Sequence, residues 1–115
     1  MKRGKLEQEI NSLTAKIYKE MLGKGPKKVK SKICEDLVIV RIERCNTIIF
    51  DHLSSSVKGR EVLKSMREKL CENFEEDAEK RYGNVLKKSV KGIYYGVKKL
   101  EEEIVLTIIC EENIL

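Results

Sequence analysis

The sequence predicts an α+β fold in which two helices pack on one antiparallel sheet made of two β-hairpins, in the order αββαββ. Residues 57–82 carry apolar side chains at steps of three and four, which is typical of a long amphipathic helix. Shorter segments on both sides either alternate apolar and polar residues or are continuously apolar, as strands do. One sheet packed on the apolar stripe of the long helix would bury both hairpins.

A first helix is predicted over residues 6–22. Its apolar residues recur at helical spacing: Leu6, Ile10, Leu13, Ile17 and Met21. Gly23 follows the last turn and suits a left-handed C-terminal cap, while Pro26 prevents the helix from continuing.

The first hairpin is predicted over residues 28–42. Residues 28–33 alternate, with lysines on one face. Glu35 and Asp36 form a turn, and residues 37–42 form a second, more apolar strand.

The long helix is predicted to end at Gly83 and Asn84. A third strand follows over residues 85–97, interrupted by glycines, and residues 103–110 form the most apolar strand. Residues 45–56 give a weaker pattern, with Thr47 placed to cap a short helical turn.

Two features predict a homodimer. The second and fourth strands are apolar on both faces, whereas a sheet with one face in water should alternate. A helix of about 26 residues is about 39 Å long, while a strand of about eight residues spans about 27 Å. A partner subunit would cover both the second sheet face and the overhanging part of the helix.

Composition predicts a single soluble domain over residues 1–115, located in the cytoplasm. Charged residues make up 37% of the chain and hydrophobic residues 41%, so the chain can form a hydrophobic core without metals or disulfides. No apolar run approaches the roughly 20 residues of a membrane span. Four separated cysteines and one histidine do not have the spacing of a zinc site, so we expect no metal and no cofactor. Cys34, Cys71 and Cys110 are expected to be small core residues.

The positive charge is concentrated in the first third of the chain. Residues 1–34 hold ten Lys or Arg against three Glu. The densest group is Lys24, Lys27, Lys28, Lys30 and Lys32. Such a patch attracts nucleic-acid phosphates or anionic headgroups, but lysines also protect an edge strand from pairing with other chains. Both interpretations stay open at this stage.

Catalytic chemistry is not indicated, and we expect a non-enzymatic protein. His52 lies near Asp51 and Cys45, but the sequence has no other histidine, no glycine elbow and no oxyanion-type loop.

Several short motifs resemble the MpsC family of small bacterial proteins, over roughly residues 6 to 110. These are Gly23-Lys24-Gly25-Pro26 after the first helix, Glu35-Asp36 before the run at residues 37–42, Lys58-Gly59-Arg60-Glu61 followed by Arg67, and the closing strand Ile104-Val105-Leu106-Thr107-Ile108. The chain departs from the family at Asn46-Thr47-Ile48-Ile49-Phe50, where only the Thr of a capping box is kept.

The resemblance implies a cytoplasmic accessory or regulatory protein, because the family name links it to a Na+-translocating, membrane-potential-generating system. We therefore expect protein–protein contacts near a membrane ion-transport system. The alternative is a nucleic-acid-binding regulator that uses the basic N-terminal third, and a small-molecule sensor is a third hypothesis. The candidate interaction surface comprises Lys24, Lys27, Lys28, Lys30, Lys32, Arg60 and Arg67.

Overall fold

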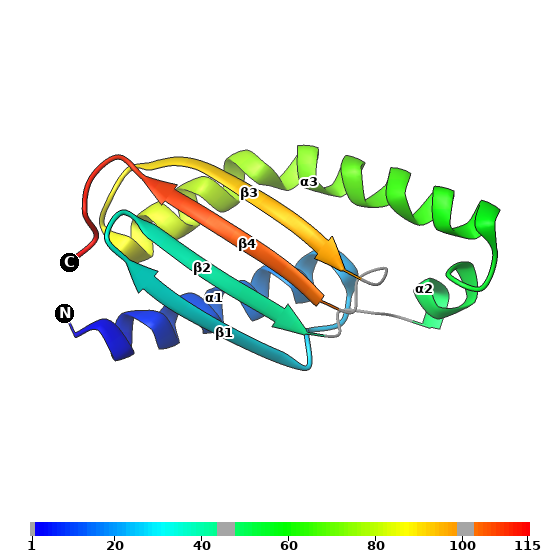
Figure 1. The fold of residues 1–115 in the computed structure, drawn as a ribbon, viewed down its shortest axis with the longest axis horizontal. Helices are drawn as coiled ribbons and strands as arrows, with labels where there is room; N and C mark the ends of the chain where they lie inside the picture. The colour runs from blue at the N-terminus through cyan, green and yellow to red at the C-terminus, as the bar shows by residue number, and fades with distance from the viewer. Residues whose placement is uncertain (1, 44–47, 99–102) are drawn as a thin grey trace.

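The computed structural model describes residues 2–43, 48–98 and 103–115. Helices α1 (Arg3–Leu22) and α3 (Val57–Leu86) lie on one face of an antiparallel sheet, and a short helix α2 (Ile48–Leu53) precedes α3 (Figure 1). The strands are β1 (Lys28–Cys34), β2 (Leu37–Glu43), β3 (Val90–Lys98) and β4 (Glu103–Cys110). The predicted α+β class, the two hairpins and the αββαββ order are confirmed, and α2 lies where a short helical turn was predicted. Thr47, the predicted cap of that turn, lies outside the described residues.

The strand order in the sheet is β1-β2-β4-β3. β2 and β4 pair in register from Leu37 opposite Ile109 to Glu43 opposite Glu103. The two most apolar strands therefore occupy the centre of the sheet, and the lysine-bearing β1 is an edge strand, where charged side chains are well tolerated.

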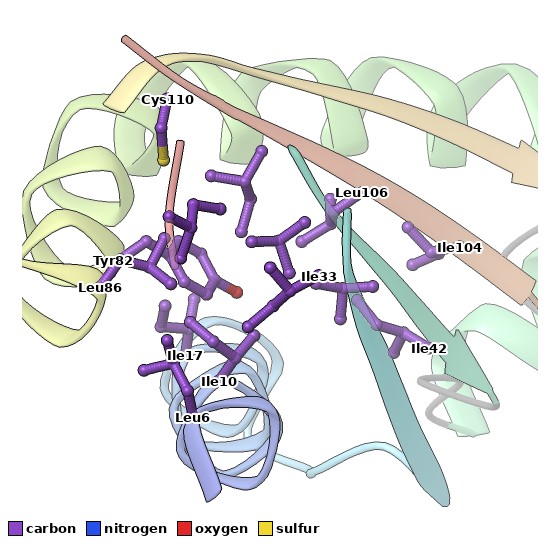
Figure 2. Close-up of a cluster of buried hydrophobic side chains, with 14 of the residues drawn as sticks. Leu6, Ile10, Ile17, Ile33, Ile42, Tyr82, Leu86, Ile104, Leu106 and Cys110 are labelled. Carbon is purple, nitrogen blue, oxygen red and sulfur yellow. The ribbon is translucent and has the colours of Figure 1, made fainter. Parts of the chain in front are cut away.

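The core lies between the two helices and one face of the sheet (Figure 2). Alternate residues of the central strands point into it: Val38, Val40 and Ile42 from β2, and Ile104, Leu106 and Ile108 from β4. The helices contribute Leu6, Ile10, Ile17, Tyr82 and Leu86. After β4 the chain turns back, and Ile114 is buried while its N–H donates to the carbonyl oxygen of Glu35 at 3.0 Å.

The hydroxyl groups of Thr14 and Tyr82 form a hydrogen-bonded pair buried inside this core. The Thr14 hydroxyl donates to the carbonyl oxygen of Ile10 at 2.7 Å, so its oxygen is left to accept from the Tyr82 hydroxyl, also at 2.7 Å. Burial raises the pKa of Tyr82 to about 12, which keeps the phenol neutral. The pair joins α1 to α3 without burying a charge.

The first helix ends as predicted, but the end predicted for the long helix was wrong. Gly23 has a φ of 79° and donates its N–H to the carbonyl oxygen of Lys19 at 2.8 Å, which is a left-handed cap. The long helix instead passes through Gly83, ends at Leu86 and caps at Lys87, which has a φ of 56°. A Cβ at Gly83 would stand 3.0 Å from the carbonyl oxygen of Lys88, so this glycine allows a close approach of the chain beyond the cap.

The start of the third strand and the burial of Cys34 also differ from the predictions. The third strand begins at Val90, because residues 85 and 86 complete the helix and Leu86 is buried in the core. Of the cysteines expected in the core, Cys110 is buried but Cys34 is exposed, since it ends the edge strand on the face away from the helices. The side chains of Cys71, Leu70 and Phe74 lie outside the described part of the structure, as does Cys45.

The long helix extends past its own sheet. Its 30 residues correspond to about 45 Å of helix, which matches the longest dimension of the molecule, 45 Å. Figure 1 shows α2 and the first half of α3 lying beyond the end of the strands, as the relative lengths predicted. We call this part, residues 48–69, the projecting arm.

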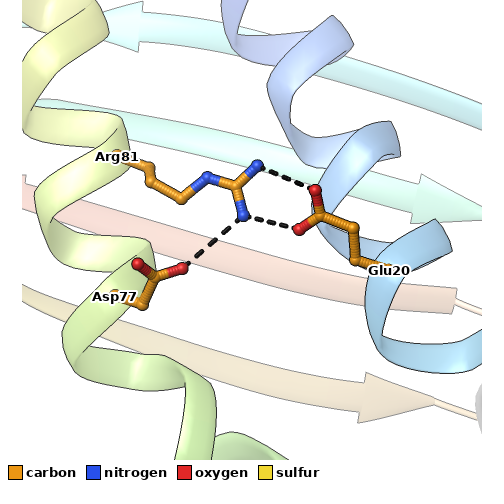
Figure 3. A network of polar contacts seen from close by, with 3 residues as sticks. All are labelled: Glu20, Asp77 and Arg81. Carbon is orange, nitrogen blue, oxygen red and sulfur yellow. Dashed lines mark hydrogen bonds and ion pairs between the residues drawn. The ribbon is translucent and has the colours of Figure 1, made fainter.

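An ion-pair network joins the two large helices at the surface (Figure 3). The guanidinium group of Arg81 lies 2.7 Å from the carboxylate of Glu20 on α1 and 3.5 Å from Asp77 on its own helix. The hydrogen bond from Arg81 lowers the pKa of Glu20 below its ordinary value. The pair therefore stabilises the folded chain when Glu20 is ionised.

We predict that Glu20→Gln lowers stability in a pH-dependent way. Because the pKa of Glu20 is lower in the folded state, its contribution is present above its ordinary pKa and is lost as pH falls through the folded value. Urea unfolding from pH 7 to about pH 3 should show the difference between wild type and Glu20→Gln shrinking toward acid. A difference that stays constant with pH would show that the carboxylate charge contributes nothing.

A second prediction compares two isoleucines in the central strands. Ile108 is 0% exposed, whereas Ile39 is 39% exposed on the opposite face. Ile108→Ala should lower the free energy of unfolding by about 2–5 kcal/mol. Ile39→Ala should cost less than about 1 kcal/mol, because little buried surface is lost. Equal losses in denaturant melts would contradict the assignment of the two faces.

Candidate functional site

Within the described residues, the face of the sheet that points away from α1 and α3 carries no helix (Figure 1), and we call it the open face. Paired residues in an antiparallel sheet share a face, so the registers assign its members in rows. The rows run from β1 to β3 as Cys34-Leu37-Ile109-Gly92, Lys32-Ile39-Thr107-Tyr94, Lys30-Arg41-Val105-Gly96 and Lys28-Glu43-Glu103-Lys98. The open face therefore combines apolar central strands with a row of lysines along one edge.

Tyr94 is the most exposed aromatic side chain of the open face, at 65%. A Cβ built on Gly92 would lie 3.6 Å from ring carbon Cε2 of Tyr94, so the ring lies close to the backbone of β3. A Cβ at this distance would make an ordinary van der Waals contact with the ring. The ring is a flat aromatic surface beside the partly exposed side chains of Thr107 and Ile109.

The charges of the open face are mostly positive. Lys28, Lys30 and Lys32 are all exposed, and they project from alternate positions of β1. Arg41 donates to the Glu103 carboxylate at 2.9 Å, which neutralises one cation at the end of the central strands. The uncompensated charge therefore lies along the β1 edge.

The structure divides the predicted interaction surface into two parts. Three lysines lie on the open face, and Lys24 and Lys27 are exposed in the connection between α1 and β1. Arg60 belongs to the projecting arm, where its Nη1 donates to the carbonyl oxygen of Ser54 at 3.2 Å. Arg67 is also in α3, but its side chain lies outside the described part. Lys28, Lys30 and Lys32 thus share the open face, while Arg60 helps to hold the corner between α2 and α3.

That corner is closely packed. Ser56 caps α3, because its side-chain oxygen accepts the N–H of Gly59 at 3.0 Å. A Cβ at Gly59 would stand 1.9 Å from the carbonyl oxygen of Leu53, so only glycine fits there. Leu63 is 2% exposed and lies outside the main core cluster. The projecting arm therefore has its own small packed region.

The hollows found in the described residues are poor small-molecule sites. One lies between α1, α3 and the sheet beside Met21, Ala78 and Tyr95, and its volume is about 90 Å³. Pockets that bind drug-sized ligands have volumes of about 300–1,000 Å³ and enclose most of the ligand surface. A larger hollow of about 450 Å³ near Glu79 and Lys88 is shallow and polar. The small volume of the first hollow and the shallow, polar shape of the second give no support to the small-molecule sensor hypothesis.

The structure also locates the residues considered for catalysis and membrane insertion. His52 and Asp51 are exposed on α2. Among the described residues, no three His, Cys, Asp or Glu side chains form a group able to hold a metal ion. Within the same residues, no helix has the length and apolar character needed to cross a bilayer.

Comparison with known protein families decides the relationship of the chain. A family model described as "Na+-translocating membrane potential-generating system (MpsC)" matches residues 2–112 of the 115 residues. The chain belongs to the MpsC family. The resemblance expected from the short motifs of this MpsC protein is therefore confirmed. No curated protein and no solved structure matches the chain.

Sequence reasoning found the lysines of the open face but missed its other members. Ile39 and Tyr94 share a row with Lys32 only through the strand order and register, which local periodicity does not specify. Gly92 and Gly96 flank Tyr94 at a spacing of two, so these three positions share one face of the strand, which was an available signal that the ring has no bulky neighbour on that face of its strand.

Proposed function

We propose that this MpsC protein is a non-enzymatic accessory or regulatory protein of the cytoplasm. It acts through protein–protein contacts near a membrane ion-transport system. The observation that supports the proposal is the open face, which presents apolar side chains of two central strands beside a row of lysines. The description of the family, a Na+-translocating system, supports the membrane setting.

The central strands make the open face suitable for docking a protein. Ile39 is 39% exposed, and its neighbours Val105 and Ile109 are also partly exposed. Burying such a surface against a partner is favourable by roughly 25 cal/mol per Å² of apolar area. The apolar centre therefore supplies affinity.

The charged edge indicates the chemistry of the partner. Lys28, Lys30 and Lys32 are exposed in a row, so a segment with carboxylates beside apolar residues would be complementary to the open face. Such charges raise the association rate and exclude basic partners. The partner fitted best is an acidic, partly apolar segment of the transport system that faces the cytoplasm.

The test uses inside-out membrane vesicles from the source cells, which expose the cytoplasmic side of the transport system. Purified protein should co-sediment with these vesicles, and binding should fall after brief protease treatment of the vesicles. Ile39→Asp and Lys30→Glu should each reduce the bound fraction by roughly tenfold. Lys16→Glu is the matched control, because it makes the same charge change at an exposed position of α1, on the other side of the sheet.

Three outcomes would contradict the proposal. The first is equal binding to protein-free vesicles of anionic lipid, which would indicate a headgroup contact. The second is equal loss of binding in Lys16→Glu, which would indicate a general charge effect. The third is no binding to any vesicle at moderate salt.

A second candidate function is binding of single-stranded nucleic acid on the open face. The observation that favours it is the row Lys32-Ile39-Thr107-Tyr94, which places a cation and a 65% exposed aromatic ring on one surface. Bases stack on exposed aromatic rings while lysines contact phosphates.

Binding of a labelled single-stranded RNA oligonucleotide tests this candidate. Tyr94→Ala should weaken binding by about 1–3 kcal/mol, whereas Tyr94→Phe, which keeps the ring, should not. Lys30→Ala should reduce the slope of log affinity against log salt by about one. Failure of the oligonucleotide to bind at low salt would exclude this function.

A further inference from the structure

The charges of α3 are divided between its two halves. Residues 57–69 hold five cations against two carboxylates: Lys58, Arg60, Lys64, Arg67 and Lys69 against Glu61 and Glu68. Residues 70–79 hold five carboxylates and no cation: Glu72, Glu75, Glu76, Asp77 and Glu79. Like charges three or four residues apart on one helix half repel each other.

Contacts within one chain offset little of this charge. Among the described side chains, the ion pairs of α3 are those of Arg81 with Glu20 and with Asp77. Glu72, Glu75 and Glu76 are exposed. The acidic half therefore presents a negative surface to solvent.

The projecting arm also exposes apolar side chains. Val62 is 43% exposed and Met66 is 39% exposed, and their spacing of four places them on one face of the helix. The exposed Lys58, Lys69 and Glu76 continue this face at helical spacing. One side of α3 thus carries Lys58 at its start, Val62 and Met66 in the middle, and Glu76 in its second half, followed one turn later by the exposed Lys80.

We propose that two copies of this chain pack their α3 helices antiparallel about a two-fold axis, so that the basic half of each helix lies along the acidic half of the other. This inference stands independently of the proposed function, because it uses α3 and leaves the open face free. A second copy is the occupant that fits, since it brings both the acidic and the basic surface in one helix. Parallel pairing would instead oppose like charges along the whole length.

The sequence positions fix an approximate register. The midpoint between Lys58 and Glu76 is residue 67, next to Met66. A two-fold axis crossing α3 there places Lys58 of each copy opposite Glu76 of its partner and brings the two Met66 side chains together. Each complementary contact then occurs twice, as an isologous interface requires. Helices that cross at about 20° remain in contact over several turns, so both contacts form together.

Sedimentation equilibrium of the full chain tests the pairing. Wild type should approach twice 13.3 kDa as concentration rises. Lys58→Glu opposes two carboxylates at both ends of the interface, and Glu76→Lys opposes two cations. Each change should raise the dimer Kd by roughly tenfold or more. Lys5→Glu is the charge-matched control at an exposed position of α1 and should leave the Kd unchanged.

Charge exchange makes the test specific. An equimolar mixture of Lys58→Glu and Glu76→Lys should form a heterodimer near the wild-type Kd, because both contacts are again between opposite charges. The double variant in one chain should recover the homodimer for the same reason. Circular dichroism of every variant checks that the chains remain folded. Met66→Asp should weaken the dimer without unfolding the chain, because Met66 is exposed.

The proposal is overturned if wild type remains a monomer at all concentrations. It is also overturned if the mixture of the two charge variants stays monomeric, or if Lys5→Glu weakens the dimer as much as Lys58→Glu. A dimer abolished by Ile39→Asp but unchanged by Lys58→Glu would place the interface on the open face instead.

Discussion

The pairing of β2 with β4 is the contact on which the rest of the structure depends. It joins the two hairpins into one sheet and places the most apolar segments of the chain at its centre. The core residues of these strands, from Val38 to Ile108, all face the helices, because this register places the inward-pointing residues of β2 opposite those of β4. A slip of one residue would turn that set toward solvent. The edge positions then fall to β1 and β3, whose lysines, glycines and exposed tyrosine suit an edge.

The same pairing determines where α3 must run. The helix follows β2 and precedes β3, and it packs along α1 and the sheet with its C-terminal half only. Tyr82, Thr14 and the ion pair of Arg81 with Glu20 fix that half against α1. The first half has no sheet beneath it and is supported by α2 at the corner formed by Gly59. The overhang is thus a consequence of a helix much longer than the strands.

Local sequence signals predicted the elements well where one physical cause dominated. Alternating lysines defined β1, a glycine in the left-handed region ended α1, and an uninterrupted apolar run defined β4 with its observed bounds. Gly83 misled because glycine serves both helix caps and close backbone approaches, and only the position of Lys88 distinguishes them. The open face depended on strand order, a non-local property, so Tyr94 could not be placed in the same row as Lys32, at the opposite edge of the sheet, from sequence alone. Cys34 was misplaced because its face depends on how β1 lies in the sheet.

The position of β4 between β2 and β3 also constrains how the chain folds. Residues 37–43 must find residues 103–109 across the whole intervening segment, and contacts of high sequence separation slow folding because loop closure precedes any stabilising contact. Most of that segment is α3, and a helix forms on a sub-microsecond to microsecond timescale. Once formed, it replaces a flexible loop with a stiff spacer that returns the chain along the sheet. The long helix therefore reduces the entropy cost of the search that completes the sheet.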